Sequence, residues 1–248
     1  MKMRPRDVLL ALVGVFLIWE VLAMGFNQAI FPPAHQVLGV FVQEIASDLG
    51  GHFLASLYRV VASTILALLL AVPAGLALGQ SPRWNNFFSP VIYLLYPFPK
   101  VVLVPILIIL FGIGDLPKIL IILIILFFQI LVLVRDQAAG LQTELIQSVR
   151  SLGAGRRALF RYVYLPASLP AVLTALRQSV GTAVAVLYVA ELFATRWGLG
   201  YYIYLKGSTL FDYPAMYAGI LAMSLLGFGL YFSVEWLEDR LCPWLHAD

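Results

Sequence analysis

The sequence predicts an all-α integral membrane protein with a single transmembrane domain over residues 1–248. Of its 248 residues, 62% are hydrophobic and 12% are charged, whereas a soluble domain is about 45–50% apolar and about 25% charged. The apolar residues form continuous runs near the ~20 residues that a spanning helix needs, unlike the short alternating segments of a transmembrane barrel. These runs predict about six transmembrane helices, at about 8–26, 54–79, 87–111, 117–134, 169–192 and 214–236.

The first span follows three basic residues, Lys2, Arg4 and Arg6. A cleaved signal peptide has the same charge pattern, but this run carries Trp19 and Glu20 and ends without a small-residue cleavage site. We therefore expect a retained helix. Between the first two spans, apolar residues at helical spacing predict a surface helix within 35–50.

Small residues mark the faces on which two spans pack. Gly75 and Gly79 in span two form a G-x-x-x-G pattern that Ala67 and Ala71 extend backward. Such residues let helix backbones approach closely in lipid. The pattern fits packing within one chain or a seam between two copies, and packing within the chain is favoured. In the last span, a similar set comprises Gly219, Ala222, Gly227 and Gly229.

The third span contains several helix-breaking residues, and we expect it to be kinked or broken. It holds Pro97, Pro99 and Pro105, and Lys100 lies among them. A lysine at mid-bilayer costs about 2.5–3.5 kcal/mol on insertion scales. Lys100 should therefore face protein, water or an interface.

Glu191, near the end of the fifth span, is the carboxylate of greatest interest because ionisable residues within a membrane are often functional. It could line a path or gate, pair with Arg59 or Arg196, or lie among the headgroups. Lys100 and Arg59 are the other candidates for a path or gate. A bare carboxylate would repel an anionic substrate, which favours a paired state for Glu191 if the substrate is an anion.

Basic residues predict the orientation in the membrane, because cytoplasmic segments carry an excess of Lys and Arg. One side collects Lys2, Arg4, Arg6, Arg83, Arg135, Arg150, Arg156, Arg157, Arg161 and Arg240. The other side collects Arg59, Lys118, Arg196 and Lys206. This difference predicts that both termini and the loop after the fourth span are cytoplasmic.

That loop, residues 137–168, is polar and rich in arginine between two apolar spans. Its residues Leu145, Ile146, Val149 and Leu152 share one face of a short helix. Gly153 can turn the chain, because glycine reaches positive φ without steric cost. A second helix is expected at about 156–164, ending at Pro166. Its apolar side would carry Leu159, Tyr162 and Val163, opposite Arg156, Arg157 and Arg161. From the residues alone, the loop either docks on a partner or only sets topology and binds anionic lipid.

The same segment resembles the cytoplasmic motif of ABC-importer permeases, E-A-A-x-x-x-G-x(9)-I-x-L-P. Gly153 matches its glycine, Val163 stands for its isoleucine, and Leu165-Pro166 matches its end. Gln147-Ser148-Val149 replaces E-A-A. The resemblance implies a type I ABC-importer permease fold with cytoplasmic coupling helices that dock on an ATP-hydrolysing subunit. The implied coupling residues are Gln147, Ser148, Val149, Leu152, Gly153, Ala154, Arg156, Arg157, Leu165 and Pro166.

Further fragments resemble the branch of the family that serves nitrate, sulfonate, taurine and bicarbonate importers. They include 56–59, 90–105, 111–114, 190–192 and 198–200. This resemblance implies a subunit that moves a small organic or inorganic anion inward by alternating access in a bacterial or archaeal cytoplasmic membrane. Its implied partners are a second copy of the chain, two ATPase subunits that bind ATP and Mg, an external solute-binding protein and membrane lipid. An aromatic or vitamin precursor is also compatible as the substrate.

The remaining motifs argue against an enzyme. The chain has no G-x-x-x-x-G-K-[ST] motif, so we expect it to bind no ATP. The single cysteine, Cys242, excludes an internal disulfide, and the histidines are scattered, so no metal or cofactor site is expected. The net charge of +3 does not imply nucleic-acid binding, because positive charge on a membrane protein mostly reflects its orientation. The alternatives are an ion-driven secondary transporter or channel, which predicts inverted repeats, and a membrane enzyme, which needs a reactive cluster. Neither feature is evident.

Overall fold

The computed structural model describes residues 5–245, and these form helices joined by short turns, with no strand among them. The chain divides into two compact units. Unit one comprises Met1–Ser56 and Thr195–Leu225, and unit two comprises Leu57–Ala194 and Leu226–Asp248. Two long helices, α3 (Asp48–Gln80) and α11 (Tyr213–Leu241), contribute residues to both units.

Four helices are long and apolar enough to cross a membrane. They are α3, α6 (Asp115–Ala139), α11, and α9 (Leu165–Glu191) together with the helical residues that precede it. A fifth span is formed if α4 (Pro82–Leu95) and the segment Lys100–Phe111, which ends in α5 (Val104–Phe111), count as one. These two parts meet at a bend of 79°, so the break predicted for the third span is present.

The first predicted span coincides with α1 (Pro5–Phe26), whose apolar part, Leu10–Phe26, is shorter than the other candidates. The total of six spans therefore stays a prediction. Lys2 and Arg4, which entered the orientation argument, lie outside the described residues, and the orientation also stays a prediction. The surface helix expected within 35–50 is α2 (Ala34–Glu44), and α3 begins soon after it.

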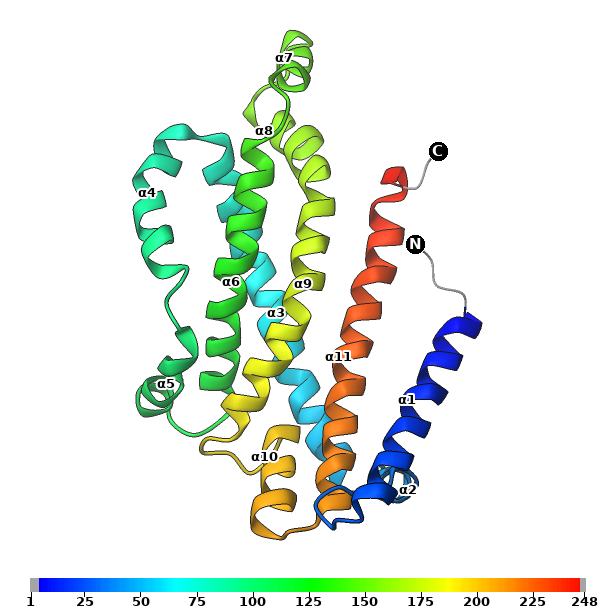
Figure 1. The fold of residues 1–248 in the computed structure, drawn as a ribbon. Helices are drawn as coiled ribbons and strands as arrows, with labels where there is room; N and C mark the ends of the chain where they lie inside the picture. Colours follow the sequence, from blue (N-terminus) through cyan, green and yellow to red (C-terminus); the bar gives the residue numbers. More distant parts are fainter. Residues whose placement is uncertain (1–4, 246–248) are drawn as a thin grey trace. The chain divides into compact units, whose positions relative to one another are not determined.

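In unit two, α6 lies beside α9 and also packs closely against α3 (Figure 1). The approach to α3 depends on Gly75 and Gly79. A Cβ atom at Gly75 would lie 2.9 Å from the Cβ of Val134, and one at Gly79 would lie 2.6 Å from both the Cβ of Ala138 and the carbonyl oxygen of Arg135. The G-x-x-x-G pattern thus packs within one chain, as favoured from the sequence.

Replacing Gly79 by alanine should destabilise the protein by about 1–3 kcal/mol, because the new methyl group overpacks a contact that includes backbone atoms. The matched control is Gly181→Ala in α9, where an added Cβ meets nothing within 4 Å in this chain. Alanine there should be neutral or stabilising, since it has the higher helix propensity. Thermal unfolding of both variants in detergent checks this. Equal melting temperatures for the two variants would contradict the close packing.

The bend in the third span is held by Lys100. Its Nζ atom donates to the carbonyl oxygens of Tyr96 at 2.9 Å and Phe98 at 3.4 Å, and it lies 4.7 Å from the ring centroid of Phe128. In a continuous helix these carbonyl groups would accept from the N–H groups of Lys100 and Val102, but the helix is broken here and the Val102 N–H donates to Pro99 instead. The ammonium group of Lys100 supplies a donor at the break. Lys100 therefore faces protein, one of the three environments expected for it.

In unit one, a short helix, α10 (Leu199–Tyr204), contacts α2 through a small polar network. Tyr202 donates a hydrogen bond from its hydroxyl group to Glu44, and Lys206 lies 3.3 Å from the same carboxylate. Burial raises the pKa of the Tyr202 hydroxyl, and the hydrogen bond to Glu44 raises it further. The phenol therefore stays protonated in the folded protein at pH values that ionise an exposed tyrosine.

This raised pKa predicts a pH dependence of stability. A group whose pKa is higher in the folded state stabilises the fold below its unfolded pKa, about 10 for tyrosine, and loses that contribution as the pH rises above it. The melting temperature should therefore fall above about pH 10, and Tyr202→Phe should reduce this fall. Tyr201→Phe serves as the control. If both variants follow the wild-type pH profile, the Tyr202 hydroxyl does not contribute to this dependence.

Candidate functional site

The loop between α6 and α9 contains two short helices around a glycine turn. They are α7 (Thr143–Ser151) and α8 (Arg156–Leu159), and Gly153 lies between them with a φ of 84°. The N–H of Gly153 donates to the carbonyl oxygen of Arg150 at 2.9 Å, which closes the end of α7. The helix, turn and helix predicted from the sequence are therefore present, and the turn uses the conformation for which glycine was expected.

None of the side chains of α7 that the structure describes is fully buried within this chain. The apolar Ile146 and Val149 are half-buried, and Leu152, directly after the helix, is 86% exposed. In Figure 1, α7 extends beyond the ends of α6 and α9. A helix of nine residues is marginal in water on its own. Its apolar side is thus available to stabilise α7 against a partner.

The second half of the loop differs from the sequence prediction. The expected helix at 156–164 does not end at Pro166 but continues through a π-helical turn, Phe160–Tyr164, into α9. The N–H of Leu165 reaches the carbonyl oxygen of Phe160. The wider turn lies directly before Pro166, whose missing N–H group interrupts the regular hydrogen-bond pattern of the continuing helix.

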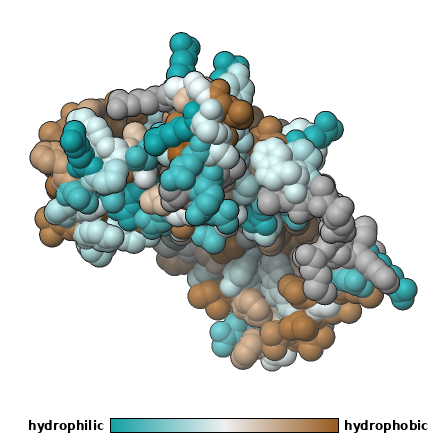
Figure 2. All heavy atoms as spheres, turned by 90° about the horizontal axis from the view of Figure 1, so that it is seen from above, coloured by the Kyte–Doolittle hydropathy of each residue, from teal (hydrophilic) through white to brown (hydrophobic). Residues whose placement is uncertain are grey.

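The same turn changes which side chains are buried. Leu159 and Val163 are buried as expected, but Tyr162 is 70% exposed, and Tyr164 is buried instead. The prediction that Tyr162 belongs to the apolar side was therefore wrong, because a π turn shifts the register of every later residue. Arg150, Arg157 and Arg161 are exposed. Figure 2 is seen from the side on which α7 lies, and it shows hydrophilic side chains over α7 and α8.

A second group of interest is a buried charge cluster in unit two, formed by Arg59, Asp115, Lys118 and Glu191. Arg59 in α3 lies 2.6 Å from Glu191 at the end of α9, and its Nε and Nη2 atoms each lie 2.7 Å from Asp115. Lys118 donates to the carbonyl oxygens of Gly114 at 2.8 Å and Ala194 at 3.4 Å. The cluster joins α3 to the beginning of α6 and the end of α9.

The cluster contains two cationic and two anionic groups, so it is neutral as a whole. Glu191 is 0% exposed and Lys118 is 1% exposed, whereas the Asp115 side chain is 52% exposed. Burial of single charges at this depth would cost several kcal/mol each. Their pairing offsets this cost, and removing one member leaves an uncompensated charge.

Of the roles considered for Glu191, the structure shows pairing with Arg59. Arg59 and Glu191 were candidates from the sequence, but Asp115 and Lys118 were not. Asp115 and Lys118 are three residues apart in the first turn of α6, directly after the glycines of the preceding loop. This spacing could have identified them as an oppositely charged pair from the sequence. Lys100 lies at the bend of the third span and is not a member of the cluster. Among the described residues, no three His, Cys, Asp or Glu side chains could together hold a metal ion.

Comparison with known proteins gives a consistent result. A family model described as "Binding-protein-dependent transport system inner membrane component" matches residues 63–242. The chain is 33% identical over 234 residues to the taurine transport system permease protein TauC of Escherichia coli (strain K12), covering 91% of this chain and 84% of the relative. It is 28% identical to a putative aliphatic sulfonates transport permease protein, SsuC, of Bacillus subtilis (strain 168), covering 94% and 85%.

A solved structure shows the same fold. The MetNI methionine ABC transporter in an inward-facing conformation contains a chain that matches with a TM-score of 0.66 at 16% sequence identity. The match covers 78% of this chain and 95% of the other. At this identity the similarity concerns the fold alone.

Proposed function

We propose that this chain, which belongs to the family of binding-protein-dependent transport system inner membrane components, forms the path of an ATP-driven importer for a small sulfonate. The family and its relatives make it an ABC-importer permease subunit and a multi-pass inner-membrane protein, and not an enzyme. Beyond the family, we propose its energy source, its partners and its substrate.

The partly exposed apolar side of α7, continued by the exposed Leu152, is the observation that carries the proposed coupling to ATP. The helix α7 is short and poorly buried in its own chain, and it lies next to the basic residues of α8. Docking in a groove of a partner would therefore stabilise it more than exposure to water does. We assign that groove to an ATPase subunit on the cytoplasmic side, which binds ATP and Mg. Two copies of the chain would act with two such subunits and an external solute-binding protein, and movement of α7 and α8 would drive alternating access.

The charge cluster supports a role for Arg59 and Glu191 at the outer end of the path. By pairing Arg59 with Glu191, the chain joins α3 to α9 where these helices approach the outer surface in the proposed orientation. We assign Arg59 and Glu191 to the outer gate, and Lys100 to the bend in the third span that borders the path. A paired Glu191 would not repel an anionic solute as a bare carboxylate would.

The substrate class is proposed from the relatives. The names of TauC and SsuC refer to taurine and aliphatic sulfonates, and taurine is itself a sulfonate. To test this, cells that produce the chain with its partner subunits are supplied with labelled taurine, an alkanesulfonate, nitrate or bicarbonate. We expect uptake of taurine or the alkanesulfonate that requires both ATP and the binding protein. Uptake that persists after ATP depletion under an ion gradient, or uptake of nitrate or bicarbonate alone, would contradict the proposal.

Reversing the charge of α8 should weaken binding of the ATPase subunit. The paired change Arg156→Glu and Arg157→Glu should lower co-purification with a tagged ATPase subunit by about tenfold, the effect of losing roughly 1.4 kcal/mol. The matched control is Arg6→Glu, which reverses an exposed arginine outside the loop. Unchanged co-purification of the paired variant would show that these arginines do not contribute to docking.

A further inference from the structure

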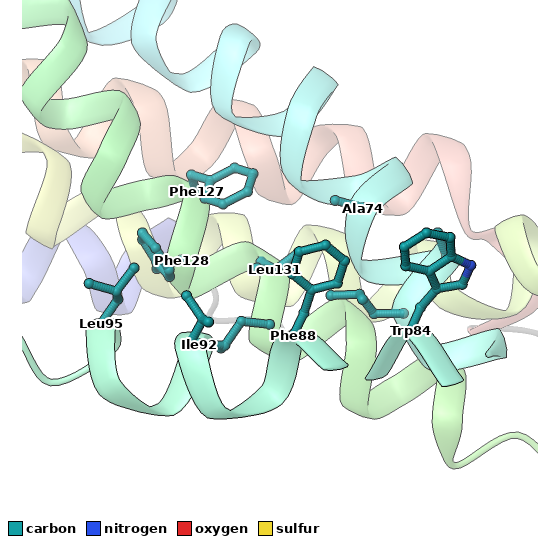
Figure 3. A pocket seen from close by; sticks show the side chains of 11 residues that line it. Ala74, Trp84, Phe88, Ile92, Leu95, Phe127, Phe128 and Leu131 are labelled. Carbon is teal, nitrogen blue, oxygen red and sulfur yellow. The ribbon is translucent and has the colours of Figure 1, made fainter. Parts of the chain in front are cut away.

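Unit two contains a cavity that neither the charge cluster nor the α7 and α8 loop uses. It has a volume of about 410 Å³ and lies between α3, α4 and α6. Figure 3 shows Phe88 and Ile92 of α4 opposite Phe128 and Leu131 of α6, with Ala74 of α3 and Trp84 at the sides. The cavity lies among helices that are candidate membrane spans, where the surrounding solvent is lipid.

The lining excludes water as a stable occupant. Apart from the indole nitrogen of Trp84, the lining side chains carry no polar group. A buried water needs two to four polar partners, whereas an apolar cavity of about 150 Å³ stays dry and binds benzene. This cavity is more than twice that size and is open on one side, where Trp84 and Val91 are exposed, so a longer hydrocarbon can enter it from the bilayer.

Three residues with hydrogen-bond donors, Arg83, Arg135 and Gln80, do not line the cavity but lie within about one helical turn of lining residues. Arg83 is exposed in the first turn of α4, next to Trp84. Arg135 follows the lining residue Leu131 by one turn of α6, and its guanidinium group lies 5.4 Å from the ring centroid of Tyr93 in α4. Arg135 therefore bridges the two helices that form the cavity walls, and its backbone lies beside Gly79 near the end of α3.

Two of these groups retain unused hydrogen-bond donors. Arg135 has a side chain that is 6% exposed and pairs with Asp136, but its Nη1 atom has no partner among the described residues. The Nε2 atom of Gln80, four residues before Trp84, is also buried without a partner in that part of the chain. Buried donors normally find an acceptor. An apolar cavity with unused donors and an exposed arginine at one end matches an amphiphile with an anionic headgroup.

We propose that this cavity binds one acyl chain of an anionic phospholipid, whose headgroup phosphate lies against Arg83, Arg135 and Gln80. The aromatic side chain of Trp84 suits the boundary between headgroup and hydrocarbon. In the proposed orientation this end of the cavity faces the cytoplasmic leaflet, where anionic lipids are concentrated. The bound lipid fills the space between α4 and α6, and so supports the bent third span.

The test uses the full-length protein in phosphatidylcholine nanodiscs with a phosphatidylglycerol that carries a diazirine in one acyl chain. After irradiation, labelled peptides should map to the cavity walls at 84–95 and 127–131. Ala77→Phe, which fills the cavity, should reduce this labelling about tenfold, since the aromatic ring takes the space of the acyl chain. The matched control is Leu94→Phe, at a position on α4 that is 77% exposed and does not line the cavity. It should leave the labelling unchanged.

Competition identifies the headgroup. Unlabelled phosphatidylglycerol should compete better than phosphatidylcholine, and Arg83→Gln should reduce this preference about fivefold, as expected for one basic residue near a membrane surface. Equal competition by the two lipids would overturn the anionic headgroup. Labelling spread evenly over the exposed helix faces would overturn the cavity site. In the Phe88→Cys variant, a disulfide between two copies of the chain, combined with an absence of lipid labelling, would contradict the bound lipid. It would show that a second copy covers the cavity.

Discussion

Replacing Glu191 by alanine should destabilise the protein by about 3–5 kcal/mol, the cost of breaking a buried ion pair from one side. The change removes the fully buried carboxylate that pairs with Arg59, whereas the remaining carboxylate, Asp115, is half-exposed. For a chain of this size the loss corresponds to a fall in melting temperature of at least about 6 °C. Thermal unfolding in detergent, followed by tryptophan fluorescence, measures it.

Two further variants test the cause of this effect. Asp115→Asn removes a carboxylate that is 52% exposed but keeps an oxygen that can accept from Arg59, so it should cost less than Glu191→Ala. The double change Arg59→Met with Glu191→Leu removes both members of the buried pair and should be more stable than Glu191→Ala. If the double variant loses as much stability relative to the wild type as Arg59→Met and Glu191→Leu lose together when made singly, the two side chains do not act as a pair.

Replacing Gly153 by proline should abolish most ATP-driven uptake while the chain still reaches the membrane. Proline fixes φ near −65°, whereas Gly153 has a φ of 84° and donates its N–H to Arg150. The turn between α7 and α8 must then rearrange. A strained backbone of this kind costs about 1–3 kcal/mol, so coupling should fall by about tenfold or more. Uptake and ATP hydrolysis are measured together in proteoliposomes.

Two alanine variants separate backbone conformation from loss of flexibility. An added Cβ meets nothing within 4 Å at Gly153 or at Gly155, but only Gly153 has a positive φ. Gly153→Ala should therefore reduce uptake, and Gly155→Ala should not. Equal uptake by the two alanine variants, together with a fully active proline variant, would show that the shape of the turn is unimportant.

Several features of the fold were predictable because they depend on local chemistry. The prolines around Lys100 interrupt a helix wherever they occur, and Gly153 stands where the chain must turn. Gly75 and Gly79 likewise indicate a close helix contact. For each of these residues, the sequence neighbours alone restrict the backbone, and the structure agrees.

Other features depend on contacts between distant segments and could not be predicted in this way. Arg59, Asp115 and Glu191 lie in three different helices, so their pairing follows from tertiary packing. The sequence allowed Glu191 several partners, and the structure shows Arg59. The π turn before Pro166 is a further case, because the sequence shows that proline disfavours a regular helix but not how the chain accommodates it.

The most direct test of the proposed function is photo-crosslinking from α7. A benzoylphenylalanine is placed at Leu152, which is 86% exposed, in the full-length chain assembled with its tagged ATPase subunit, and again at Leu94 as a control. If α7 docks as proposed, Leu152 crosslinks to the ATPase subunit and Leu94 does not. A complex in which Leu152 yields no such crosslink, or in which both positions crosslink equally, would contradict the docking of α7 on that subunit.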